Sequence, residues 1–278
     1  MTILMRERKQ AAPPPDRSDR PHRSVSQRNM YRRCPKQFRL IRIEGVWTRP
    51  DAWSAQGKAV HEAAAALERS GRTMTLEAVQ AVFRAHYDWE ISQQLETTPN
   101  MDFWADSGHR YPAAEDIKRR RTLGLDQCRA YFEWCQANPE QTPAIIDGRR
   151  AVEMEVRFSL GEVPILGYID NVSTVPDRPL RVRDIKTGDP GSDHFQLGTY
   201  AVALFLLYGI ETTEGDYWKG QTGRLSRVKD LSAYTVEHLT DEFGALDENI
   251  RAERFDPTPS PAVCRSCPVN SRCEQRAV

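Results

Sequence analysis

The spacing of apolar residues along this chain changes once, after Pro143, and the change restricts the folds that the chain can adopt. Before it, apolar residues recur every three or four positions, as in helices that bury one face. Helices are expected at about 24–41, 54–70, 75–95 and 113–137. After it, apolar side chains from Val152 to Phe158 alternate with polar ones, which is typical of a half-buried strand. The chain is therefore expected to combine a helical N-terminal half with a sheet.

The C-terminal half carries further strand and helix patterns. Strands are expected at about 163–174 and 180–187, a buried helix at 193–209, a strand pair at 213–219 and 224–229, and an amphipathic helix at 235–253. No internal repeat is visible. The order of these elements predicts one α/β domain over residues 24–278, with a mixed central sheet flanked by helices.

Charge is balanced over the whole chain but concentrated at one end. Lys plus Arg and Asp plus Glu both number 39, whereas residues 1–50 hold 13 basic and 4 acidic residues. Residues 1–23 include three consecutive prolines and show no apolar period, so they are expected to form a disordered basic arm. The most apolar run, 197–210, is too short to cross a bilayer, and no secretory signal opens the chain. A cytoplasmic protein without a membrane partner is expected.

Three cysteines near the C-terminus have the spacing of a metal or cluster site. The pattern C-x2-C-x5-C is formed by Cys264, Cys267 and Cys273. A fourth ligand is needed, and the tail offers neither another Cys nor a His. Cys34 is the natural candidate, because Cys128 and Cys135 lie seven apart in a helical pattern and are expected in the core. The alternative is a zinc knuckle in the tail with an unrelated Cys34.

A site that joins Cys34 to the tail would close a loop of about 230 residues. If the loop-entropy model for disulfides is applied to this link, it stabilises the folded state by about 5 kcal/mol. The two chain ends would then be tied together.

Two acidic residues and a lysine are expected at neighbouring positions of the sheet. Asp170 lies near the end of one predicted strand, and Asp184 and Lys186 share a face of the next. Two carboxylates brought together repel each other unless a cation binds them, and oxygen ligands suit Mg²⁺ or Mn²⁺. Lys186 would then orient a water molecule or stabilise charge on a phosphate. Taken alone, such a triplet is more often a solvated strand face.

These residues are part of a longer series. The series is Gly57-Lys58-Ala59-Val60-His61, Glu155, Asp170, Asp184-Ile185-Lys186 and Gln196-Leu197-Gly198-Thr199-Tyr200. In this order it resembles the RecB-type nucleases of the PD-(D/E)XK superfamily. With Cys34 and the cysteine tail, residues 25–276 resemble the branch that carries a 4Fe-4S cluster, which includes AddB nuclease domains and the nucleases of CRISPR adaptation. The resemblance implies a restriction-endonuclease-like core.

The resemblance also implies roles for individual residues. The implied ligands of Mg²⁺ or Mn²⁺ are His61, Asp170, Asp184 and the carbonyl of Ile185. Lys186 is the implied catalytic lysine, with Gln196 and Tyr200 as its support, four residues apart on one helix face. Either Glu155 or Glu153 is the extra upstream acid. The implied ligands of the 4Fe-4S cluster, which would tie the two chain ends, are Cys34, Cys264, Cys267 and Cys273.

Asp184 stands where many relatives have Glu, a change that leaves the ligand chemistry intact. The expected reaction is hydrolysis of DNA phosphodiester bonds, by an exonuclease that prefers single-stranded ends and acts in DNA repair, recombination or processing. The alternative is a non-catalytic nucleic-acid-binding scaffold, or an accessory subunit of a helicase or of a CRISPR adaptation complex.

Two basic segments and one aromatic loop are candidates for contacts with DNA. The arm through Arg42 and the run 118–121 could bind phosphates, although the run is more typical of a solvated helix face. The loop 97–112 carries aromatic rings that either stack on unpaired bases or pack against the domain. These residues are Phe103, Trp104, His109 and Tyr111.

Overall fold

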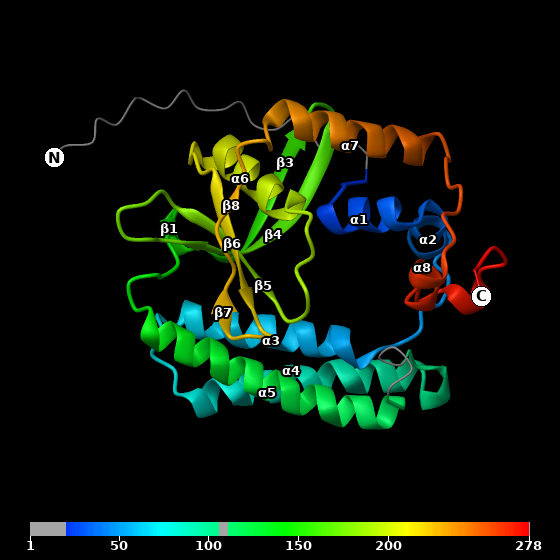
Figure 1. The fold of residues 1–278 in the computed structure, drawn as a ribbon, viewed down its shortest axis with the longest axis horizontal. Helices are drawn as coiled ribbons and strands as arrows, with labels where there is room; N and C mark the ends of the chain where they lie inside the picture. Colours follow the sequence, from blue (N-terminus) through cyan, green and yellow to red (C-terminus); the bar gives the residue numbers. More distant parts are fainter. Residues whose placement is uncertain (1–20, 106–110, 278) are drawn as a thin grey trace.

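A mixed β-sheet forms the centre of the computed structural model, which describes residues 21–105 and 111–277 (Figure 1). Its strands are β3 (Val152–Leu160), β4 (Val163–Ser173), β5 (Arg181–Lys186), β6 (Glu214–Lys219), β7 (Arg224–Leu225) and β8 (Lys229–Asp230). They lie in the order β3-β4-β5-β6-β7, and β8 also pairs with β6. β5 and β6 run parallel, and the other pairs are antiparallel. A separate hairpin contains β1 (Ile145–Ile146) and β2 (Arg149–Arg150).

Three long helices pack together on one side of the sheet (Figure 1). They are α3 (Ala52–Arg69), α4 (Leu76–Thr97) and α5 (Ala113–Ala137), with a short 3-10 turn, η2 (Met101–Phe103), before α5. The side chains of Asp51 and Thr75 cap α3 and α4 by accepting hydrogen bonds from the first turn. The buried face of α3 is rich in alanine, so neighbouring elements can approach it closely. Ile185 of β5 and Trp218 of β6 pack into the same apolar cluster.

The opposite side of the sheet is covered by α6 (Phe195–Tyr208) and α7 (Val236–Arg251). α6 is apolar on nearly every face because it packs both against the sheet and against α7. It ends at Gly209, whose φ of 65° lies in the left-handed region that glycine tolerates best. This arrangement confirms the expected mixed sheet with helices on both sides.

The first described helices and the C-terminal segment lie side by side at one end of the molecule (Figure 1). The elements there are α1 (Val25–Arg33), α2 (Pro35–Phe38), the π-helical turn η1 (Arg39–Ile43), α8 (Pro261–Arg265) and the 3-10 turn η3 (Asn270–Arg272). Phe38 and Phe255 stack with their ring centroids 6.3 Å apart, and Tyr31 packs edge-on against both rings. The N–H of Arg49 donates to the carbonyl of Pro268 at 3.0 Å. Ring packing and backbone hydrogen bonds therefore hold these two segments together.

Most expected elements are present with small shifts of their boundaries, but some expectations were wrong. The helix expected at 24–41 is interrupted at Cys34, whose backbone is extended because a residue before proline avoids the α region. The strand expected at 224–229 is two short strands, β7 and β8, and the β1–β2 hairpin was not expected.

The boundary of the basic arm is also different. Arg23 was expected to be disordered, yet it is 6% exposed and its guanidinium lies 2.6 Å from Asp247. Its backbone pairs with β4, donating to Pro164 O at 2.7 Å. Residues 1–20 lie outside the described ranges. Among the helices in those ranges, none has the length and apolar character needed to cross a membrane.

Candidate active site

β4 and β5 stop pairing partway along the sheet, and acidic residues lie where the pairing ends, a place called the opening of the sheet below. The two strands pair over three residues each, and the last pair is Asn171 with Arg183. Asp170 and Asp184 are the next residues beyond that pair, one on each strand. The carboxylate of Asp170 accepts a hydrogen bond from the N–H of Ile185 at 2.7 Å and so bridges the two strands. The fold therefore brings both predicted aspartates to one place.

His61 of α3 reaches the opening from the helical layer. Its Nδ1 lies 3.3 Å from Asp170 Oδ2 and 3.6 Å from Glu153 Oε1. One ligand atom from each of these three residues lies within 4.8 Å of the other two, a spacing that one metal ion can bridge. Burial favours the neutral imidazole, but the charge and hydrogen bond of Asp170 outweigh it and raise the pKa of His61 well above its usual value.

Asp184 lies deeper in the opening, beside Lys186. Its side chain is 1% exposed, and Lys186 Nζ lies 2.8 Å from its Oδ2. Burial and the negative charge of Asp170 raise the pKa of Asp184 to about 7, against the opposing effect of Lys186. Although Asp170 is also buried, the charge and hydrogen bond of His61 and the N–H of Ile185 lower its pKa. A divalent cation bound here would displace the protons that the site retains near neutral pH.

Lys186 is held in place from α6. Its Nζ donates to Gln196 Oε1 at 2.9 Å, and Gln196 Nε2 donates to Tyr200 Oη at 3.2 Å. Tyr200 packs over Gly167 of β4, where a Cβ would lie 2.9 Å from the Tyr200 ring. The predicted lysine, glutamine and tyrosine thus form one hydrogen-bonded row, and a glycine provides the space for its last member.

The structure separates the two glutamates that the sequence left as alternatives. Glu153 lies between Val152 and Met154, whose partners on β4 flank Asp170, and it has a φ of 46°, which is uncommon for a residue with a side chain. Its carboxylate faces His61. Glu155, the glutamate included in the motif series, instead accepts hydrogen bonds from Arg157 and Tyr168 on the exposed face of the hairpin. Strand alternation places both glutamates on one face, so only the backbone distortion at Glu153 distinguishes them.

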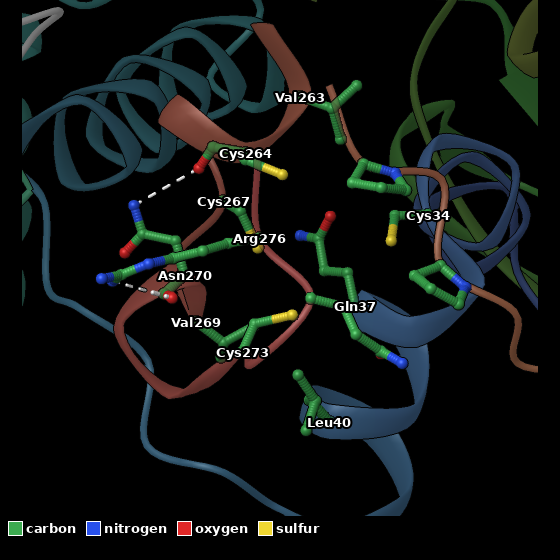
Figure 2. Close-up of a pocket in the computed structure, with 13 residues that line it drawn as sticks. Cys34, Gln37, Leu40, Val263, Cys264, Cys267, Val269, Asn270, Cys273 and Arg276 are labelled. Carbon is green, nitrogen blue, oxygen red and sulfur yellow. Dashed lines mark hydrogen bonds between the residues drawn. The ribbon is translucent and has the colours of Figure 1, made fainter. Parts of the chain in front are cut away.

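Four cysteines from the two chain ends line a single pocket (Figure 2). They are Cys34, Cys264, Cys267 and Cys273. Cys128 and Cys135 lie elsewhere, buried among α3, α4 and α5. Leu40 and Val269 are among the apolar residues around the pocket. The structure therefore brings together the four thiols that the sequence grouped and keeps the other two apart from them.

Polar groups around this pocket are suited to negatively charged sulfur. Burial favours the neutral thiol of Cys34, but backbone N–H groups at Thr258, Gln37 and Lys36 outweigh it and lower its pKa. The N–H of Ala277 donates to Cys264 Sγ at 3.3 Å. Burial raises the pKa of Cys267, and the nearby charge of Cys34 adds to the effect. Cys34 and Cys267 are therefore close enough for the charge of one thiol to affect the pKa of the other.

Several arginines of the two basic segments pair with acidic residues within the described ranges. Arg28 lies in the expected basic arm, yet its side chain is 5% exposed and pairs with Asp193 and Glu242. In the run 118–121, Arg119 pairs with Asp116 and Arg121 with Asp88. These contacts favour the solvated-face interpretation of the run and give Arg28 a structural role, while the arm as a path for phosphates stays a prediction.

The aromatic residues of the loop 97–112 have different environments. Trp104 is 2% exposed and donates to the carbonyl of Thr98, so it packs against the domain. Tyr111 lies against the guanidinium of Arg119. Phe103 is exposed, and His109 lies outside the described residues.

Sequence analysis missed Tyr168, an exposed aromatic residue two positions from Asp170. Its position between Gly167 and Asp170 was the signal that could have identified it.

Comparisons with known proteins identify the superfamily of this chain. The gene 69 protein of Mycobacterium phage D29 is 41% identical over 261 residues, covering 91% of this chain and 96% of that protein. The gene 69 protein of Mycobacterium phage L5 is 37% identical over 280 residues, with the same coverage. A crystal structure of a candidate exonuclease from Eubacterium rectale superposes with a TM-score of 0.48 at 10% identity, over 92% of this chain and 89% of that one. Residues 22–274 match the PD-(D/E)XK nuclease superfamily, and the chain therefore belongs to that superfamily.

Proposed function

We propose that this protein is a RecB-type deoxyribonuclease that uses Mg²⁺ or Mn²⁺ and degrades DNA from single-stranded ends. The observation that carries the proposal is the position of Lys186, beside two buried aspartates and a histidine at one opening of the sheet. A lysine and carboxylates arranged in this way serve phosphodiester hydrolysis, in which a nucleophilic water is oriented and developing negative charge is stabilised.

The metal would be held by His61, Asp170, Asp184 and Glu153, with the carbonyl of Ile185 as a further ligand. This donor set fits Mg²⁺ or Mn²⁺, because most of its ligand atoms are carboxylate oxygens. The carboxylates of Asp170 and Asp184 are buried, and the negative charge of Asp170 raises the pKa of Asp184. When bound, the ion would act as a Lewis acid on the scissile phosphate.

The protein side chains at the site have different proposed roles in the reaction. Lys186 holds its ammonium next to Asp184, where it can orient the attacking water or neutralise charge on the phosphate. Gln196 fixes the direction of that ammonium, and Tyr200 fixes Gln196. Asp170 keeps the two strands at a constant separation through the N–H of Ile185.

We also propose that the four-cysteine pocket holds a 4Fe-4S cluster. Four cysteine thiolates are the usual donor set of a 4Fe-4S cluster, and the four cysteines grouped from the sequence line this one pocket. Gln37 also lines the pocket, and its buried Oε1 has no hydrogen-bond partner among the described residues. Since amide oxygen and nitrogen are interchangeable by rotation, that position can present an N–H to a sulfide.

The proposed role is the repair, recombination or processing of DNA in the cytoplasm, where thiolates remain reduced. DNA is the proposed partner. An accessory position beside a helicase or in a CRISPR adaptation complex would retain the same chemistry.

The test is a cleavage assay on protein purified without oxygen. End-labelled single-stranded and double-stranded DNA are incubated with Mn²⁺, Mg²⁺ or EDTA, with Lys186→Ala as the matched control. We expect metal-dependent shortening of the single strand that is absent with EDTA and with Lys186→Ala. A parent protein that binds DNA but leaves every substrate intact would favour the non-catalytic scaffold instead.

A further inference from the structure

One face of the β3–β4 hairpin is left uncovered beside the proposed metal site. Tyr168 of β4 is 47% exposed, which is unusual for an aromatic ring near the middle of a long strand. Its cross-strand partner is Glu155, and Arg157 follows on the same face of β3. None of the aromatic contacts recorded among the described residues involves the Tyr168 ring. The ring is therefore accessible to a ligand.

The hydroxyl end of Tyr168 is nevertheless fixed. Tyr168 Oη donates to Glu155 Oε2 at 2.9 Å, and Arg157 Nε donates to Glu155 Oε1 at 2.5 Å. The carboxylate thus uses both oxygens, one to hold the tyrosine and one to hold the arginine. An exposed ring with a fixed hydroxyl loses little conformational freedom when another flat group stacks on it.

The position of the ring relative to the site follows from the strand. Gly167 faces Tyr200 on the α6 side of the sheet, so the next side chain, Tyr168, leaves from the opposite side. Asp170, which contacts His61 of α3, lies two residues farther along β4. Two residues of a strand span about 6.6 Å, which places the ring about one nucleotide from the metal ligands.

We propose that Tyr168 stacks on the base of the nucleotide adjacent to the scissile phosphate and thereby selects an unpaired strand. The inference rests on the proposed nuclease function and deepens it. Arg157 is paired with Glu155, so this face offers little net positive charge and its exposed ring is the feature suited to DNA. Stacking on an aromatic ring tolerates any base, which suits an enzyme that digests DNA without regard to sequence. The surface is continuous with the proposed metal site, and that continuity identifies a DNA strand as the occupant.

The experiment pairs variants of Tyr168 with substrates that lack one base. The variants are Tyr168→Ala, Tyr168→Phe and Tyr168→Trp, and the matched control is Phe205→Ala, an exposed aromatic at the end of α6. Each is assayed with Mn²⁺ on single-stranded DNA that carries one abasic nucleotide at successive positions. Stacking of one base contributes enough that its loss should raise KM by about 5- to 150-fold.

The expected result is a specific interaction between residue and base. An abasic nucleotide at one position should raise KM for the parent, whereas Tyr168→Ala should have a raised KM on normal DNA and no further rise with that abasic nucleotide. Tyr168→Phe and Tyr168→Trp should retain the sensitivity, and Phe205→Ala should match the parent.

Two other outcomes are distinguishable. If Tyr168→Ala cuts normal DNA like the parent, or remains equally sensitive to the abasic nucleotide, the inference is wrong while the proposed nuclease function stands; a protein partner would then be the better occupant of this face. If the parent cuts none of the substrates, the proposed function is rejected, and the inference with it.

Discussion

The opening in the sheet and the four-cysteine pocket differ in what holds them together. Asp170 and Asp184 lie on strands of a six-stranded sheet, and each has a side chain less than 10% exposed. The cysteines lie on short helices and turns at the chain ends, and all four are only partly buried. The fold therefore preorganises the first site before any ion binds, whereas the proposed cluster would add rigidity to the second. Changes to the first should affect activity, and changes to the second should affect stability.

The largest expected effect is on catalysis at the sheet opening. Lys186→Ala and Asp184→Asn should reduce DNA cleavage by about 10³-fold or more, because each removes a charge aimed at the reacting phosphate or at the metal. The melting temperature without metal should not fall for Asp184→Asn, since the raised pKa of Asp184 shows that its charge is unfavourable there. Cleavage rates and thermal melts in EDTA test both parts. A variant that unfolds at a much lower temperature would show that this site is structural as well.

The second prediction concerns the cysteine pocket. Cys34→Ser should lose the brown colour and the absorbance near 400 nm expected of thiolate-bound iron, together with stability. The loop-entropy value of about 5 kcal/mol is an upper bound, because the Tyr31, Phe38 and Phe255 rings already hold the ends together.

Cys128→Ser is the matched control for this change. Cys128 is 2% exposed in the helical core, so its variant should keep the colour and lose only about 1 to 3 kcal/mol for a buried hydroxyl. Iron and sulfide analysis with thermal melts measures both variants. Full iron content in Cys34→Ser would show that the fourth ligand is another residue. Stoichiometric zinc in the parent would show that the pocket binds zinc and not a cluster.

The third prediction uses the pKa shifts of the metal-free site. Asp184 has a pKa raised from 3.8 to about 7, so between those values the folded state keeps a proton that the unfolded state has lost. The free energy of unfolding should then fall as pH rises through this range, by about 1.4 kcal/mol per pH unit for one proton. The raised pKa of His61 acts in the same direction at higher pH, because its contribution is lost as pH rises through the folded-state value.

Bound metal should reverse this trend, since ligands must lose their protons to bind it. Melting temperatures from pH 5 to 8, in EDTA and in Mn²⁺, should diverge as pH rises, and Asp184→Asn should flatten the EDTA curve. Parallel curves for the parent in the two conditions would contradict metal binding at these residues.

The smallest expected effect comes from Gly167. In Gly167→Ala the new methyl group would lie 2.9 Å from the Tyr200 ring, which must move and so loosens Gln196 and Lys186. We expect kcat to fall about tenfold, KM to change little, and the iron content to stay constant. Gly148→Ala in the β1–β2 hairpin has open space around it and should keep the parent kcat, although its φ of 75° will cost some stability. Equal kcat for parent and Gly167→Ala would show that the Tyr200 contact does not position the lysine.

The sequence by itself determined the fold class, because the change from helical to alternating apolar spacing at Pro143 is local information. It also grouped Asp170, Asp184 and Lys186 on two successive strands, since alternation along a strand fixes which side chains share a face. Cys34 could be assigned to the tail cysteines because the other two candidates follow a helical period.

Tertiary structure decided what depends on distant segments. Glu153 and Glu155 are equivalent in the pattern of β3, and only the left-handed backbone at Glu153 turns one of them toward His61. Arg23 and Arg28 resemble a free basic arm until Asp247, Asp193 and Glu242, more than 160 residues away, neutralise them. Charge and burial act through space, so a residue's partner in the fold, and not its neighbours in the chain, sets its role.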